Sequence, residues 1–79
     1  MLINIKYFAA LRDSTKISKE SLNTSSLTAG ELFDELHSKY DFSLGKKQIK
    51  VAINEAYSDF NYQLKENDTV VFIPPVAGG

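Results

Sequence analysis

Apolar and polar residues alternate over the first segment of the chain, residues 2–9. Ile3, Ile5 and Tyr7 fall on one face of this segment, as expected for a strand with one side against a core and the other in water. Phe8 is the exception, because it places a large aromatic ring on the face that otherwise carries polar side chains. The pattern predicts a first β-strand with an exposed aromatic residue at its end.

The next segment is more polar and has a weaker pattern. The polar residues around positions 12–15 predict a turn, and residues 16–22 predict a second strand that pairs with the first as a hairpin. Residues 23–26 then read as a loop that separates this hairpin from the next element.

A helix-start signature follows the loop. Thr28 can accept a hydrogen bond from the free backbone N–H groups, and Glu31 can reach back to complete a capping box. Leu27 is placed to pack against Leu32 as a hydrophobic staple. Apolar residues then repeat at three- and four-residue spacing, which predicts a helix with one face against a sheet. This apolar face consists of Leu32, Phe33, Leu36 and Tyr40.

Two further strands are predicted in the second half of the chain. Residues 49–53 alternate and end at Asn54-Glu55, and an irregular stretch follows. Residues 69–73 form a buried apolar run, which Pro74 and Pro75 end because proline has no backbone N–H to donate. One helix and about four strands indicate an α+β domain, a mixed sheet with the helix across one face and the first and last strands side by side.

The size, charge and residue content of the chain argue against several classes of function. The chain has 79 residues, 43% of them hydrophobic, which is enough for one small core and leaves little room for a separate catalytic cleft. Nine Lys and Arg against ten Asp and Glu give a net charge of -1, which argues against a nucleic-acid partner. Without cysteine and with a single histidine, neither a thiol nucleophile nor a metal site is expected. No apolar run reaches the roughly 18 residues of a membrane span, so a cytoplasmic protein with no membrane partner is expected.

The end of the chain differs from the rest. Residues 1–73 are predicted to form the domain, and residues 74–79 an extended, flexible tail that ends in two glycines. The candidate reactive group is the terminal carboxylate of Gly79. That carboxylate is anionic and has no leaving group, so another enzyme must activate it before it can carry a group such as sulfur.

Three segments resemble the family of molybdopterin synthase small subunits, proteins with the β-grasp fold of ubiquitin. They are the ending Val-Val-Phe-Ile-Pro-Pro-Val-Ala-Gly-Gly (residues 70–79), Val-Ala-Ile-Asn (51–54) and Tyr-Phe-Ala (7–9). The resemblance covers nearly the whole chain, and the double proline before the Gly-Gly end is its most specific part. It implies a ubiquitin-like β-grasp fold.

The resemblance also implies a sulfur carrier in molybdenum cofactor biosynthesis. An adenylating enzyme, similar to ubiquitin-activating enzymes, would use ATP to activate Gly79, and a sulfurtransferase system would supply sulfur for a thiocarboxylate. The tail would enter the large synthase subunit, in a heterotetramer of two small and two large subunits, and donate sulfur to cyclic pyranopterin monophosphate. Catalytic side chains are expected on the large subunit, so this chain would be a non-catalytic donor with no bound cofactor. The inserted residues would be Pro74, Pro75, Val76, Ala77 and Gly78.

An exposed apolar patch docks both partners in that family, and the matching residues here are Phe8, Tyr57 and Ile73. The alternative is that the domain's own loops cover these three side chains. Two positions depart from the family pattern, with Asn67 where glycine is usual and Thr69 where an acidic residue is common. Since asparagine tolerates left-handed backbone angles, the turn at Asn67 is expected to persist.

Two other functions stay open. One is a sulfur carrier of another pathway, such as that of the thiamin thiazole, although such carriers tend to be shorter and to lack the double proline. The other is a ubiquitin-like modifier whose Gly79 is joined to lysines. An enzyme that acts alone is the least supported class, since the sequence offers no nucleophile and base constellation.

Overall fold

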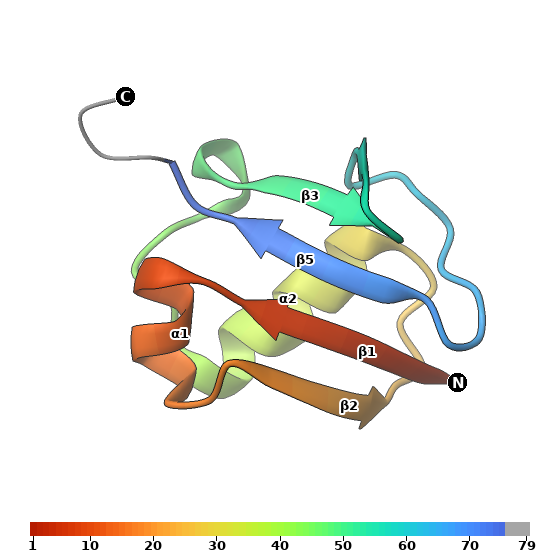
Figure 1. The fold of residues 1–79 in the computed structure, drawn as a ribbon, viewed down its shortest axis with the longest axis horizontal. Helices are drawn as coiled ribbons and strands as arrows, with labels where there is room; N and C mark the ends of the chain where they lie inside the picture. Colours follow the sequence, from red (N-terminus) through yellow and green to blue (C-terminus); the bar gives the residue numbers. More distant parts are fainter. Residues whose placement is uncertain (76–79) are drawn as a thin grey trace.

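The structure is a computed structural model that describes residues 1–75, and it contains a five-stranded mixed sheet with two α-helices and one 3-10 turn. The longer helix, α2, crosses behind one face of the sheet, and the opposite face is not covered by a helix (Figure 1). None of the described helices is long and apolar enough to cross a membrane. The elements are β1 (Leu2–Tyr7), α1 (Ala9–Thr15), β2 (Lys19–Asn23), α2 (Ala29–Tyr40), η1 (Lys46–Gln48), β3 (Lys50–Ile53), β4 (Ala56–Ser58) and β5 (Thr69–Ile73).

The strand order is β2-β1-β5-β3-β4, with β1 and β5 parallel at the centre. The prediction that the first and last strands lie side by side is therefore confirmed. Because the two strands run in the same direction, with Tyr7 opposite Phe72, they end at the same edge of the sheet. The elements that follow these strands, α1 after β1 and the two prolines after β5, thus lie at the same end of the molecule, where Figure 1 shows the ends of β1 and β5.

The core lies between α2 and the sheet. The predicted inward face of β1 is confirmed, since Ile3, Ile5 and Tyr7 are all fully buried. The apolar face of α2 packs on it, and the ring of Phe33 meets that of Phe72 edge-on with 5.3 Å between centroids. Burial of such large apolar side chains is the main force that holds a small domain together.

The start of α2 follows the predicted signature in part. The Thr28 hydroxyl accepts from the backbone N–H of Glu31 at 3.1 Å, so the predicted cap is confirmed. The Glu31 carboxylate accepts from the N–H of Leu27, one residue earlier than a capping box requires. Leu27 is 66% exposed, and the predicted staple against Leu32 is therefore wrong.

The predicted turn at residues 12–15 is wrong, because this segment belongs to α1. Leu11 and Thr15 lie four residues apart and are both buried, while the polar residues between them line the outer side of the helix. Two turns of helix leave only a short apolar stripe, which is why the pattern resembled a polar turn. The helix ends with Lys16 in the left-handed conformation, and β2 begins at Lys19, later than expected.

The structure has one strand more than predicted, β4, which lies in the stretch that was expected to be irregular. Its three residues are all exposed, so no alternation of apolar and polar positions announces it. A two-residue turn joins it to β3, and both turn residues, Asn54 and Glu55, have positive φ angles of 50° and 74°. This is the geometry of a type I′ hairpin turn, whose second position favours glycine.

Replacing Glu55 by glycine is expected to stabilise the domain, because it removes the strain of a side chain at φ 74°. We expect a gain of about 0.5–1 kcal/mol in unfolding free energy, or roughly 2–8 °C in thermal midpoint for a domain of this size. Thermal unfolding of Glu55→Gly beside Glu55→Ala measures this. The alanine variant loses the same charge but keeps the Cβ atom, so an equal gain in both variants would contradict the explanation.

Candidate functional site

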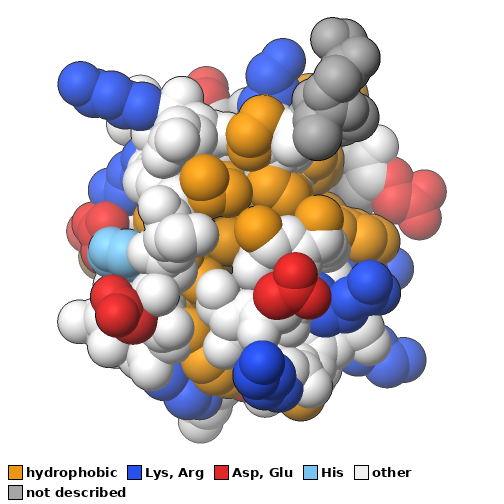
Figure 2. Space-filling view, turned by 90° about the vertical axis from the view of Figure 1, so that its left-hand side faces the viewer, with side chains coloured by type: hydrophobic (Ala, Val, Ile, Leu, Met, Phe, Trp, Pro, Cys, Tyr) orange, Lys and Arg blue, Asp and Glu red, His pale blue; other side chains and the backbone are white. Residues whose placement is uncertain are grey.

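The end of β5 leads the chain out of the domain beside an apolar hollow. Ile73 is half-buried, Pro74 is buried and Pro75 is exposed, so the described chain reaches the surface at Pro75. Figure 2 shows that hydrophobic side chains gather over this end of the molecule. The hollow has a volume of about 460 Å³ and is lined by Phe8, Ala9, Ala10, Leu44, Ile73, Pro74 and Pro75.

A second hollow, of about 250 Å³, lies on the other side of the same segment. Tyr57 and Lys50 line it together with Ile73 and the two prolines. Ile73 therefore lies between the two hollows, one bordered by Phe8 and the other by Tyr57. Phe8 is 50% exposed and Tyr57 76%, so the domain's own loops do not cover these two rings. The three predicted patch residues thus lie around Pro74 and Pro75, at the end of the described chain.

The structure describes only some of the residues predicted to react or to insert into the partner. Pro74 and Pro75 are described, while Val76, Ala77, Gly78 and Gly79 lie outside the described residues. The division into a domain of residues 1–73 and a tail of residues 74–79 thus stays a prediction.

Phe8 is held at the edge of the patch by the backbone that follows it. Its carbonyl accepts from the N–H groups of Leu11 and Arg12 at 3.1 and 3.4 Å, so Phe8 caps α1 without a side-chain bond. Ala9 turns the chain from strand into helix with φ 50°, an uncommon angle for a residue that carries a Cβ. The ring of Phe8 is therefore set by a short and strained junction between β1 and α1.

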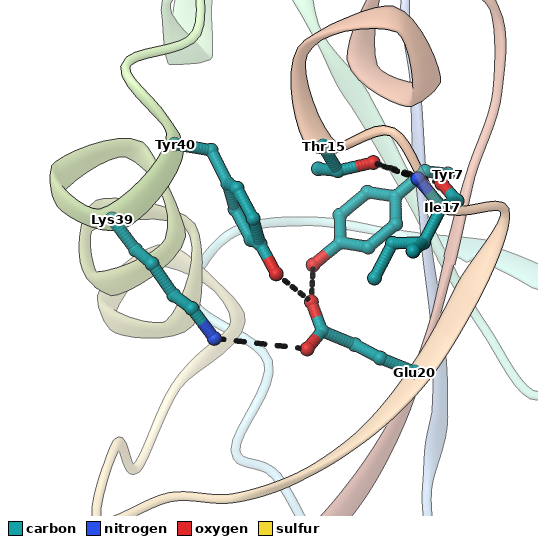
Figure 3. Close-up of polar contacts among 6 residues, drawn as sticks. All are labelled: Tyr7, Thr15, Ile17, Glu20, Lys39 and Tyr40. Atoms are coloured by element: carbon teal, nitrogen blue, oxygen red, sulfur yellow. Dashed lines mark hydrogen bonds and ion pairs between the residues drawn. The ribbon is translucent and has the colours of Figure 1, made fainter.

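A polar cluster holds the end of β1 next to Phe8, on the face of the sheet that α2 covers. The hydroxyls of Tyr7 and Tyr40 donate to one carboxylate oxygen of Glu20 at 2.5 and 2.8 Å, and Lys39 lies 3.8 Å from the other oxygen (Figure 3). Burial, followed by the hydrogen bond to Glu20, raises the pKa of Tyr7, and burial and Glu20 raise that of Tyr40. Both phenols stay protonated at neutral pH, so the cluster holds β1, β2 and α2 together and supplies no nucleophile.

A second polar cluster holds the other end of β5. Asp68 is 6% exposed, and its carboxylate accepts from the Asn54 amide, the Tyr62 hydroxyl and the N–H of Lys65 at 2.9–3.0 Å. Asn67, beside it, has a φ of 68°, which confirms that asparagine supports the left-handed turn where the family has glycine. Asp68 thereby ties the β3–β4 turn and the loop before β5 to the start of that strand.

Sequence reasoning missed both clusters, because each includes a hydrogen bond between residues 13 or more positions apart, such as Tyr7 to Glu20 and Asn54 to Asp68. It also missed Leu44 and Ala10 as walls of the apolar hollow. A period-two pattern finds residues on one strand face, but residues that loops and helices add to a surface leave no such signal. Within residues 1–75, no group of three or more His, Asp or Glu side chains could hold a metal ion.

Comparison with known proteins adds to this geometry. A model of the ThiS family matches residues 5–79. The molybdopterin synthase sulfur carrier subunit of Haemophilus influenzae is 30% identical over 81 residues, covering 99% of this chain and all of the relative. The subunit of the same name from Mycobacterium tuberculosis is 32% identical over 80 residues, covering 98% of this chain and 96% of the relative.

Solved structures share the same fold. SAMP1 from Haloferax volcanii superposes with a TM-score of 0.80 at 21% identity, over the full length of both chains. A chain from the complex of subunits 1 and 2 of the molybdopterin-converting factor of Helicobacter pylori 26695 gives 0.71 at 24% identity, again over both full lengths. These likenesses confirm the α+β, ubiquitin-like β-grasp fold.

Proposed function

This chain belongs to the ThiS family of β-grasp sulfur carriers, and we propose that it carries sulfur for the synthesis of molybdopterin, the organic part of the molybdenum cofactor. The carrying group is the terminal carboxylate of Gly79. The observation that supports this proposal most is full-length similarity of 30–32% to two molybdopterin synthase sulfur carrier subunits. The double proline, which lies beside an exposed apolar hollow, agrees with it, as does the Gly-Gly ending of the sequence.

The proposed chemistry takes place on the backbone. A carboxylate oxygen of Gly79 attacks the α-phosphorus of ATP, and the bond to pyrophosphate breaks, leaving an acyl-adenylate. Sulfide, the simplest donor, then attacks the carbonyl carbon, and the carbon–oxygen bond breaks as AMP leaves and a proton is released. The product is a thiocarboxylate, whose sulfur is a nucleophile at neutral pH. In the cell a sulfurtransferase system would supply the sulfur.

We infer three partners: an adenylating enzyme, the sulfurtransferase system and a large synthase subunit that receives the tail. The Helicobacter pylori structure is itself a complex of subunits 1 and 2 of molybdopterin-converting factor, which supports the last of these. The proposed docking surface is the patch of Phe8, Tyr57 and Ile73, because any enzyme that reacts with Gly79 must approach the exit of the tail. Two such chains with two large subunits would make the heterotetramer, in the cytoplasm where ATP is available.

The test is a reconstitution with purified proteins from the same genome. The chain, its adenylating enzyme, ATP and sulfide are incubated, and intact-mass spectrometry should show one terminal oxygen replaced by sulfur. Adding the large subunit and cyclic pyranopterin monophosphate should then return the original mass and yield molybdopterin. Thiocarboxylate that forms but is used only by thiazole synthesis would assign the chain to the thiamin pathway. Conjugates to lysines, without sulfur transfer, would assign it to the protein modifiers.

A further inference from the structure

Three lysines lie on the sheet face that α2 leaves uncovered. Lys6, Lys19 and Lys50 belong to β1, β2 and β3, and all three are exposed. Lys6 alternates with the buried Ile5 and Tyr7, and Lys19 is its cross-strand partner. Lys50 directly precedes the buried Val51, which points to the core. The three lysines therefore lie on the face opposite the core, and α2 covers the other face of the sheet (Figure 1). An open hollow of about 410 Å³ runs between β1 and β2, and both Lys6 and Lys19 line it.

Lys6 and Lys19 face each other directly across the two strands. The N–H of Tyr7 donates to the carbonyl of Ser18, so Tyr7 and Ser18 form a hydrogen-bonded pair. Hydrogen-bonded and non-hydrogen-bonded pairs alternate along an antiparallel ladder, so the neighbouring pair of Lys6 and Lys19 is non-hydrogen-bonded. In such pairs the two side chains lie closer together. The next pair of this class, Asn4 and Ser21, shows how close the side chains are, because the Ser21 hydroxyl donates to the Asn4 amide oxygen at 2.8 Å. Like charges opposite each other at this spacing destabilise an isolated sheet.

Few carboxylates offset this charge. The ion pairs among residues 1–75 join Lys39 to Glu20 and Lys46 to Asp34, and none involves the three lysines of the open face. Glu20 turns its carboxylate to the opposite side of the sheet, toward Tyr7 and Tyr40 (Figure 3). Two further acids lie near these lysines: Glu55 lines a hollow with Lys6, and Asp59 lines one with Lys50.

This positive face is continuous with the proposed docking patch. Lys50 pairs with Ile73 across β3 and β5, and it lines the hollow beside Tyr57 and the two prolines. The chain beyond Pro75 is four residues long, so its carboxylate extends at most about 14 Å from that point. A protein that reacts with Gly79 must therefore approach the edge of this face where Lys50 lies.

We propose that Lys6, Lys19 and Lys50 form a basic docking face that fits an acidic surface of the adenylating enzyme, an inference that rests on the proposed function. A carrier must leave this enzyme before it can deliver its sulfur, so the encounter has to be fast and reversible. Charge complementarity raises association rates more than it prolongs complexes. A basic face therefore favours the short-lived complex with the adenylating enzyme more than a stable complex with the large synthase subunit.

The experiment measures initial rates of adenylation by pyrophosphate release, with the purified full-length chain as the varied substrate. The variant Lys6→Gln/Lys19→Gln/Lys50→Gln is compared with a control, Lys16→Gln/Lys46→Gln/Lys65→Gln, which loses the same charge from positions outside these hollows. We expect kcat/KM of the first variant to fall about 10-fold near 50 mM salt, through KM and not kcat. The difference should nearly vanish at about 1 M salt, where the Debye length is about 3 Å.

Two further readouts separate docking from folding and from apolar contact. The open-face variant should unfold at the same temperature as the wild type or higher, because the repulsion between Lys6 and Lys19 is gone. A Tyr57→Ser variant should lose kcat/KM at every salt concentration, since apolar contact is not screened. Equal kcat/KM for the two triple variants would overturn the basic docking face while leaving the proposed function intact. A wild-type chain that the enzyme does not adenylate would overturn the proposed function and this inference with it.

Discussion

Deleting Gly79 should reduce thiocarboxylate formation at least about 100-fold while leaving the domain fully folded. The shortened chain still ends in a glycine carboxylate with the same intrinsic reactivity. It stops about 3.4 Å short of the position that the reacting carbon must reach. A displacement of even about 1 Å costs roughly a factor of 100 when reacting atoms must align, so reach alone accounts for the loss.

Intact-mass spectrometry after incubation with the adenylating enzyme, ATP and sulfide measures this effect. The matched control deletes Ala77 instead, which shortens the tail by one residue but keeps the Gly-Gly end. An equal loss in both variants supports the reach explanation, whereas activity retained without Ala77 would show that the enzyme reads the two glycines and not the tail length. Thiocarboxylate formed at a normal rate on the chain without Gly79 would contradict the assigned role of that residue.

Replacing Asp68 by alanine should give the largest loss of stability among single changes outside the apolar core, about 3 kcal/mol. The reason is that one buried carboxylate satisfies three donors, from Asn54, Tyr62 and Lys65. For a domain of this size that loss lowers the thermal midpoint by roughly 12–24 °C. Asp34→Ala is the control, because it removes a carboxylate with one exposed ion pair and should cost under about 1 kcal/mol.

The same carboxylate should make stability depend on pH. Burial by itself raises the pKa of Asp68, but hydrogen bonds from Asn54, the Lys65 N–H and Tyr62, with the Lys65 charge, hold it below its ordinary value of 3.8. Because the folded pKa is the lower one, the stabilisation is complete above the unfolded pKa and is lost as the pH falls through the folded pKa. Urea unfolding between about pH 5 and pH 2 should show this loss in the wild type, and Asp68→Asn should lack that contribution. If the unfolding free energies of the wild type and Asp68→Asn changed with pH in the same way, the Asp68 carboxylate would not be the source of the pH dependence.

The sequence predicted correctly those elements whose pattern involves only neighbouring residues. The alternation of Ile3, Ile5 and Tyr7 set the inward face of β1, and Thr28 set the start of α2, because a strand face and a helix cap each depend on residues a few positions apart. Residues 12–15 misled, since their polarity is equally compatible with a turn and with the outer side of a short helix. Only the burial of Leu11 and Thr15 against the rest of the domain distinguishes the two.

The sequence by itself determined the α+β class, the outward position of Phe8 and the candidate reactive carboxylate at Gly79, because alternation, helix capping and chain ends are local properties. Tertiary structure alone decided that Phe8, Tyr57 and Ile73 lie around Pro74 and Pro75. It also decided that lysines of three strands share one open face and that Asp68 meets Asn54. These arrangements depend on strand order and register, which bring together residues that are distant in the chain and share no local pattern.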